Sequence, residues 1–266
     1  STFSFAQKKK HVLDPEKAIS QYTLKTWSVE DGLPSLSLTD IVQLGNQHIW
    51  IGTYNGLVRF DGIQFDVFNT NNTLSLQSSS ITSLATDNDK LWIGTHKGIS
   101  YYENNEFKEH PSLEKISGYS VEKLFIDSDK RLWIGTTAHG LYVLGQDDVL
   151  NKITHPKINN SPVKAIAQSK EKEIWVGTDL GDLYKINSAL QATIAYPSSF
   201  TSGISTLYLS KSGVLWIGTN KGLLQAENGK VIEDESITFN DAGDILEDAF
   251  GNIWLTNNNG IYRVKK

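Results

Sequence analysis

A tryptophan recurs six times at nearly constant spacing along this chain of 266 residues. Most copies lie in the motif Trp-Ile-Gly-Thr, and the last copy reads Trp-Leu-Thr-Asn. The six are Trp50, Trp92, Trp133, Trp175, Trp216 and Trp254, at intervals of 42, 41, 42, 41 and 38 residues. A fixed period of about 40 residues indicates that the chain is built from repeated structural units.

The segments between the tryptophans have the character of strands. Short runs of β-branched and aromatic residues are separated by turns that contain Gly, Asn or Asp, and no ten-residue stretch sustains helical spacing. In the second repeat the runs are Ser80–Ala85, Leu91–Thr95, Ile99–Tyr102 and Phe107–Glu109. Four strands per period are typical of one blade of a β-propeller. We therefore predict an all-β fold, a β-propeller of six four-stranded blades.

The repeated motif has a packing rationale. Along a strand, Trp92 and Gly94 point to one face, while Leu91, Ile93 and Thr95 point to the other. Because blades stack face to face, both faces of this strand should be buried. The glycine leaves room on its face for a side chain of the next blade. The repeated tryptophans are therefore predicted to be core residues and not ligand contacts.

The two ends of the chain suggest how the ring closes. The last repeat offers three strands, Ile245–Glu247, Ile253–Leu255 and Ile261–Val264, whereas Gln21–Trp27 precedes the first repeat as an unpaired strand. Adding Gln21–Trp27 to the last blade would remove two exposed edges. We expect residues 21–266 to form a propeller closed by this strand, after a flexible leader at residues 1–20. The alternative is part of a longer seven-bladed or double propeller.

Composition narrows the choice of partners. A net charge of −5 and a pI near 5.7 give no basic field for nucleic acid. No apolar run is long enough for a membrane span, so no membrane insertion is expected within this chain. The absence of cysteine excludes disulfides and thiolate metal sites. At the N-terminus, Ser4-Phe5-Ala6 has the small-x-small pattern that precedes a signal-peptidase cut.

Several motifs resemble the two-component regulator propeller repeat over about residues 21–266. They are the Leu-Trp-Ile-Gly-Thr-x-x-Gly-Leu pattern in Leu91–Ile99 and Leu215–Leu223, the entry Trp27–Pro34 with Ser37–Ile41, and Gly56–Gly62. Members of this family are extracytoplasmic sensor regions of bacterial membrane receptors whose output modules are histidine kinases, hybrid kinases or diguanylate cyclases. The resemblance implies a periplasmic, non-catalytic sensor domain in signal transduction, and it strengthens the signal-peptide interpretation.

Ligand-binding residues are expected in the turns between second and third strands, because these turns emerge on one face around the channel. Loops on a rigid scaffold often bind ligands. Residues there vary between blades, which suits a pocket but equally suits neutral surface drift. A small polar ligand such as a saccharide, another protein or a second copy of the chain are the expected partners. The candidates are Tyr54, Asn55, His96, Lys97, His139, Asp179, Asn220, Lys221 and Asn258.

Catalytic readings are weaker, and we predict no catalytic residues, metal or cofactor. The turns Asp127–Lys130 and Glu247–Asn252 resemble the Asp-box turns of sialidases, but those enzymes need clustered arginines. The three arginines, Arg59, Arg131 and Arg263, are not expected to converge. The repeat also loosely resembles streptogramin-lyase propellers, for which His139 would be the first candidate. No common hydrolase, phosphate-loop or zinc-protease motif occurs.

Overall fold

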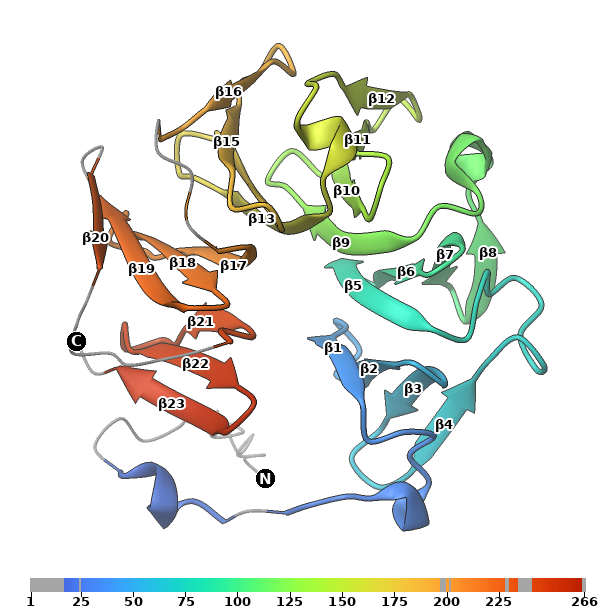
Figure 1. Cartoon of the computed structure of the whole chain (residues 1–266). Helices are drawn as coiled ribbons and strands as arrows, with labels where there is room; N and C mark the ends of the chain where they lie inside the picture. Colours follow the sequence, from blue (N-terminus) through green and yellow to red (C-terminus); the bar gives the residue numbers. More distant parts are fainter. Residues whose placement is uncertain are drawn as a thin grey trace, which may run out of the picture.

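A computed structural model describes residues 17–23, 25–196, 200, 202–227, 230–233 and 241–264. Within these residues, 23 strands form six antiparallel sheets arranged around a ring (Figure 1). The predicted six-bladed β-propeller is confirmed. Residues 1–16 of the predicted leader at residues 1–20, with the signal-peptide pattern, lie outside the described residues. No helix in the described part is long and apolar enough to cross a membrane.

Strands follow one another in sequence order within each blade, and the first strand of each blade lies nearest the centre of the ring (Figure 1). Four short 3-10 helices lie in connections: η1 (Ile19–Gln21), η2 (Val29–Asp31), η3 (Pro111–Ile116) and η4 (Ile158–Asn160). The strands are β1 (Leu38–Gln43), β2 (Ile49–Thr53), β3 (Gly56–Phe60) and β4 (Phe65–Phe68) in blade 1; β5 (Ile81–Asp87), β6 (Lys90–Thr95), β7 (Gly98–Glu103) and β8 (Glu106–Glu109) in blade 2; β9 (Val121–Ile126), β10 (Leu132–Thr136), β11 (Leu141–Leu144) and β12 (Leu150–Ile153) in blade 3; β13 (Val163–Gln168), β14 (Ile174–Thr178), β15 (Leu183–Ile186) and β16 (Ala192–Ile194) in blade 4; β17 (Ile204–Leu209), β18 (Leu215–Thr219), β19 (Gly222–Glu227) and β20 (Lys230–Glu233) in blade 5; and β21 (Ile245–Glu247), β22 (Ile253–Asn257) and β23 (Gly260–Val264) in blade 6.

The tryptophans form the cores between successive blades. Trp50 of β2 packs with Ile81 and Leu84 of β5 in one buried cluster, and the same arrangement recurs at each of the next four interfaces. Trp50 and Trp133 are wholly buried. At about 25 cal/mol per Å² of apolar surface, burying one such ring contributes a few kcal/mol per interface. The prediction that the motif serves packing is confirmed for these five tryptophans.

The motif glycine is required by the close approach of the next blade. A Cβ on Gly177 would lie 2.5 Å from Cγ2 of Ile204, the first residue of β17. A Cβ on Gly94 would lie 2.8 Å from Cγ1 of Val121. Both distances are shorter than carbon atoms tolerate, so any side chain at these positions would push neighbouring blades apart. Blade 6 carries Thr256 at the equivalent position.

The predicted closing strand is wrong. The described residues of 21–27 form no strand, and blade 6 has three strands in the described part. Trp27 instead packs edge-on against Phe60 and Phe65 of blade 1, with ring centroids 5.2 and 6.2 Å apart. Burial of this large ring on blade 1 outweighs strand pairing on blade 6. The chain just before this segment touches blade 6, because Arg263 Nη2 donates to the carbonyl of Lys17 at 2.7 Å.

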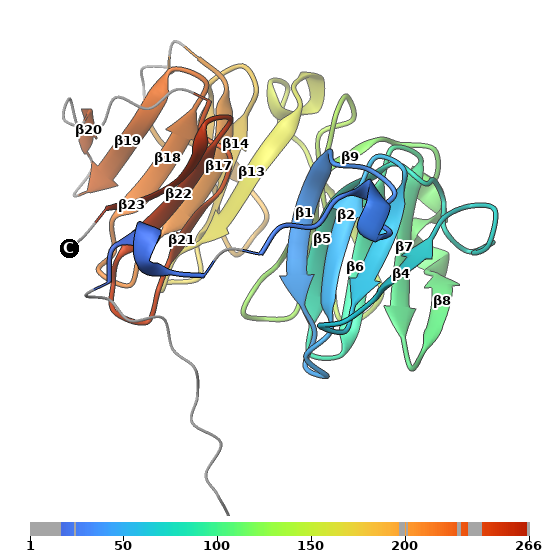
Figure 2. The same cartoon turned by 90° about the horizontal axis from the view of Figure 1, so that it is seen from below.

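Blades 1 and 6 each present a face that has no neighbouring blade in the described chain (Figures 1 and 2). Leu38 and Ile41 of β1 are 54% and 63% exposed, whereas their equivalents in β5, β9, β13 and β17 are at most 8% exposed. Ile261 of β23 is 62% exposed, whereas its equivalents in the other five blades are at most 5% exposed. We call these two faces the seam.

Candidate functional site

In blades 1 to 5, the turns between second and third strands are held by the threonine that ends the motif. In blade 2, Thr95 Oγ1 donates to the carbonyl of Gly98 at 2.9 Å and accepts the backbone N–H of Lys97 at 3.1 Å. Gly98 has φ +129°, which other residues rarely adopt. Thr53, Thr136 and Thr219 make the same bond to the turn glycine. The scaffold of each tip is therefore fixed while its outer side chains are free to vary.

Eight of the nine candidate residues are exposed at these tips, and Asp179 is partly buried. Tyr54 of blade 1 and His96 of blade 2 lie together, with ring centroids 6.1 Å apart. Asp179 Oδ1 pairs with Lys164 Nζ at 2.9 Å. Among the described residues, no hydrogen bond or ion pair joins the candidates to one another. The tips thus form a varied polar surface around the channel and not a closed constellation.

His139 has an aromatic partner that the sequence analysis missed. Its ring stacks on Tyr119, with centroids 3.7 Å apart and an interplanar angle of 7°. Tyr119 lies in the connection that leads into β9. The sequence could have indicated Tyr119 as a candidate, because it lies in a loop between blades and these loops emerge on the same face as the tips. Within the described residues, no group of three or more His, Asp or Glu could hold a metal ion.

The Asp-box-like turns have a structural role. Asp127 Oδ2 accepts hydrogen bonds from Trp133 Nε1 and Arg131 Nε, both at 2.7 Å. Asp248 Oδ2 likewise accepts from Trp254 Nε1 at 2.9 Å. Desolvation raises the pKa of Asp248, but the hydrogen bonds from Trp254, Asn252 and the turn backbone outweigh it and lower the pKa to about 2. These carboxylates anchor the indole N–H of their own blade.

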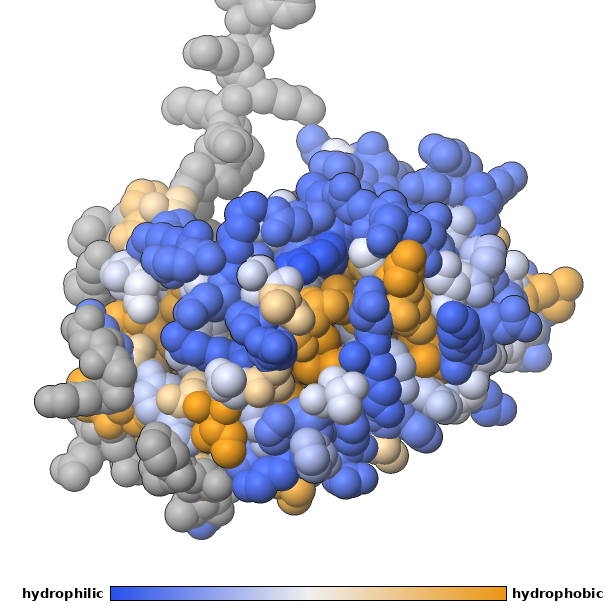
Figure 3. Space-filling model, turned by 90° about the horizontal axis from the view of Figure 1, so that it is seen from above, coloured by the Kyte–Doolittle hydropathy of each residue, from blue (hydrophilic) through white to orange (hydrophobic). Residues whose placement is uncertain are grey.

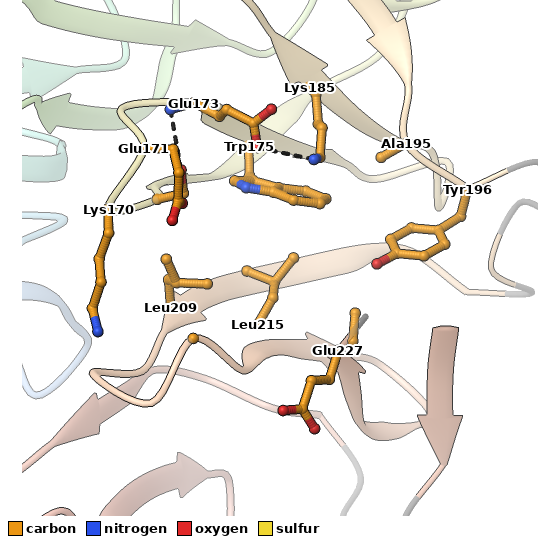
Figure 4. A pocket seen from close by; sticks show the side chains of 13 residues that line it. Lys170, Glu171, Glu173, Trp175, Lys185, Ala195, Tyr196, Leu209, Leu215 and Glu227 are labelled. Atoms are coloured by element: carbon orange, nitrogen blue, oxygen red, sulfur yellow. Dashed lines mark hydrogen bonds and ion pairs between the residues drawn. The ribbon is translucent and has the colours of Figure 1, made fainter. Parts of the chain in front are cut away.

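None of four surface hollows is lined by a candidate residue, although the one lined by Ile99 and Ser117 adjoins the tip of blade 2. One of about 280 Å³ lies between the outer parts of blades 4 and 5, with Trp175, Leu209 and Leu215 in its wall (Figure 4). Tyr196 lines the same hollow, and burial raises the pKa of its phenol. The outer rim over β12 and β16 is mostly polar, with apolar side chains visible in narrow stretches (Figure 3).

Comparison with known families identifies the repeat. Residues 75–97, which include the motif around Trp92, match the family model described as two component regulator propeller. One copy of the repeat therefore resembles the two-component regulator propeller repeat. A comparison with curated proteins found no match.

Several solved structures resemble the chain. The extracellular domain of a hybrid two component system from B. thetaiotaomicron matches with a TM-score of 0.63 and 19% identity, covering 86% of this chain and 38% of that one. PorZ, a surface component of the type-IX secretion system of Porphyromonas gingivalis, matches with a TM-score of 0.67 and 16% identity, covering 85% and 38%. Virginiamycin B lyase from Staphylococcus aureus matches with a TM-score of 0.67 and 13% identity, covering 87% and 81%. At these identities the likeness establishes the fold. The chain spans about two fifths of the length of the first two structures.

Proposed function

We propose that this regulator propeller is the periplasmic sensor region of a bacterial signalling receptor and that it binds a small polar ligand without transforming it. The observation that carries the proposal is the regulator repeat itself, which matches the family model at residues 75–97 and recurs around the ring. The fold shared with the extracellular domain of a hybrid two component system supports it.

The tips supply the chemistry for such a ligand. The threonine hydroxyl groups hold the backbone of these turns in one conformation. The outer side chains of the turns offer an aromatic ring, amides, cations and a carboxylate. Tyr54 and His96 form a pair of exposed rings at the junction of blades 1 and 2, and Lys97 adds a cation beside them. Aromatic rings with nearby hydrogen-bonding groups suit a saccharide, whose C–H faces pack on rings while its hydroxyl groups bond to polar side chains.

A thermal-shift screen of the whole chain against saccharides and other polar metabolites tests this function. A compound that binds only the folded state raises the melting temperature by mass action. We expect at least one compound to do so and His96→Ala with Lys97→Ala to weaken the shift. Ser128→Ala is the matched control, because Ser128 is an exposed residue of the turn between β9 and β10 in blade 3, at the opposite end of the strands from the tips. A screen in which no compound stabilises the chain would contradict ligand sensing.

The second candidate function is a protein-interaction scaffold, which could include a homodimer. The exposed apolar side chains of the seam favour it, since Leu38, Ile41 and Ile261 occupy positions that are buried in every other blade interface. Light scattering coupled to size-exclusion chromatography tests self-association. A monomer at all concentrations would exclude the homodimer. Backbone amides of the seam that stay protected from hydrogen exchange would exclude the seam as an open docking surface.

A further inference from the structure

The hollow between blades 4 and 5 exists because one residue departs from the repeat. In each blade that follows another, one third-strand residue covers the tryptophan of the preceding blade. This residue pairs with the position just before the motif tryptophan, as Tyr102 pairs with Leu91 and Ala226 with Leu215. The equivalents are Tyr102, Leu144, Ile186, Ala226 and Val264.

Ala226 is the smallest of the five, and the hollow lies where its side chain ends. Tyr102 covers Trp50 with a ring centroid distance of 4.7 Å, whereas Ala226 leaves the corresponding space beside Trp175 empty. Val264, the next smallest, coincides with a second hollow of about 130 Å³ at Trp216. The hollows at Trp175 and Trp216 thus coincide with the two smallest of the five residues.

The indole N–H of Trp175 also lacks the partner that two other blades provide. Six residues before Trp133 and Trp254, an aspartate accepts the indole N–H, but before Trp175, as before Trp216, the residue is a serine. Ser169 Oγ instead accepts the backbone N–H of Glu173 at 3.1 Å. Trp175 Nε1 is buried and has no hydrogen-bond partner among the described residues. Figure 4 shows this nitrogen at the end of the hollow where Glu171 lies.

The rim defines the charge that the hollow accepts. Lys185 Nζ pairs with Glu173 Oε2 at 2.9 Å and lies 4.4 Å from the centroid of Trp175, so a cationic ligand would meet a cation already over the ring. Glu171 and Glu227 also line the hollow and oppose an anionic ligand. An uncharged ligand avoids both penalties. A lysine ammonium group can donate hydrogen bonds to the hydroxyl groups of such a ligand, and a glutamate carboxylate can accept hydrogen bonds from them.

Resting on the proposed sensing function, we propose that this hollow is a binding site for an uncharged ring compound that carries hydroxyl groups. Its apolar face lies on Leu209, Leu215 and Tyr196, and its hydroxyl groups face Lys185 and Glu173 at the rim (Figure 4). An oxygen at the inner end would lie toward the unpaired N–H of Trp175 and would make the bond that Asp127 makes in blade 3.

The test follows the seven indole N–H signals of the whole chain by NMR during titration with glucose, xylose and maltose. Trp175→Phe assigns the Trp175 signal. We expect at least one sugar to shift this signal, and Ala226→Leu, which restores the residue of blade 3, to weaken binding at least tenfold without lowering the melting temperature. Tyr196→Ser should weaken binding similarly, and it decides the question if Ala226→Leu does not fold.

Further outcomes separate the hollow from the sensing function. His96→Ala, at the tips, should leave the titration unchanged. A sugar that binds but loses binding with His96→Ala and not with Ala226→Leu overturns the hollow while the sensing function stands. If none of the three sugars shifts the Trp175 signal, the hollow is not a binding site for such compounds. If glucuronate or glucosamine binds as tightly as the neutral sugars, the preference for uncharged ligands is wrong.

Discussion

Replacing Gly177 by alanine tests whether the glycines of the motif set the distance between blades. The added Cβ would lie 2.5 Å from Ile204 Cγ2 and 3.0 Å from Ile204 Cβ, in an interface where Ile204 is wholly buried. Overpacking of this kind costs about 1–3 kcal/mol. We expect a loss of about 2 kcal/mol in the free energy of unfolding, which for a chain of this size lowers the melting temperature by roughly 4–8 °C.

The clash should depend on its partner. In an Ile204→Ala background the methyl group that obstructs the new Cβ is gone, so Gly177→Ala should cost about 1 kcal/mol or less, giving a coupling energy near 1 kcal/mol. Urea unfolding followed by tryptophan fluorescence measures all four proteins. Gly45→Ala is the matched control, because its added Cβ would meet only the exposed carboxylate of Asp89. Equal losses in both backgrounds, or a Gly45→Ala loss as large as that of Gly177→Ala, would refute the packing argument.

Three further changes address the turns. Thr136→Val removes the buried 2.7 Å hydrogen bond to the Gly140 carbonyl and should lower the free energy of unfolding in urea by about 1 kcal/mol; an unchanged urea midpoint would contradict a stabilising role of this bond. Asp127→Ala leaves the wholly buried indole N–H of Trp133 unpaired and should lower the free energy of unfolding by about 2 kcal/mol in the same assay. A loss no larger than that caused by replacing an exposed aspartate would contradict this role. The folded-state pKa of Asp248 is about 2, below its ordinary 3.8, so its stabilisation is complete above about pH 4 and is lost as the pH falls from 4 to 2. Solvent screening limits this effect to roughly 1 kcal/mol, and unfolding curves of Asp248→Asn should lack this part of the pH dependence.

The sequence predicts the parts of the fold that repeat. The spacing of the tryptophans gives the number of blades, and the glycine two residues after five of them predicts the close contact seen between Gly177 and Ile204. Both features follow from the periodicity of the strands, which is a local property of the sequence. The path of Gln21–Trp27 does not follow from local sequence, because the packing of Trp27 against Phe60 competes with strand pairing and depends on contacts distant in sequence.

The candidate sites were predictable to different degrees. The turns at the tips follow from the position of each glycine, and the structure places all nine candidates at those tips. The hollow beside Trp175 was not predicted, although the small residue Ala226 and the serine at position 169 are both visible in the sequence. Its detection requires the register between strands and the packing of one blade on the next, which bring residues 57 positions apart to one place.

The central claim is that the propeller binds a small polar molecule and leaves it unchanged. The most direct measurement mixes the whole chain with a pool of polar metabolites, isolates the protein by size exclusion, and identifies what it retains by mass spectrometry. The account predicts that at least one compound co-elutes with the folded protein and is released with its original mass. A protein that retains nothing, or that returns the compound with an altered mass, would contradict it.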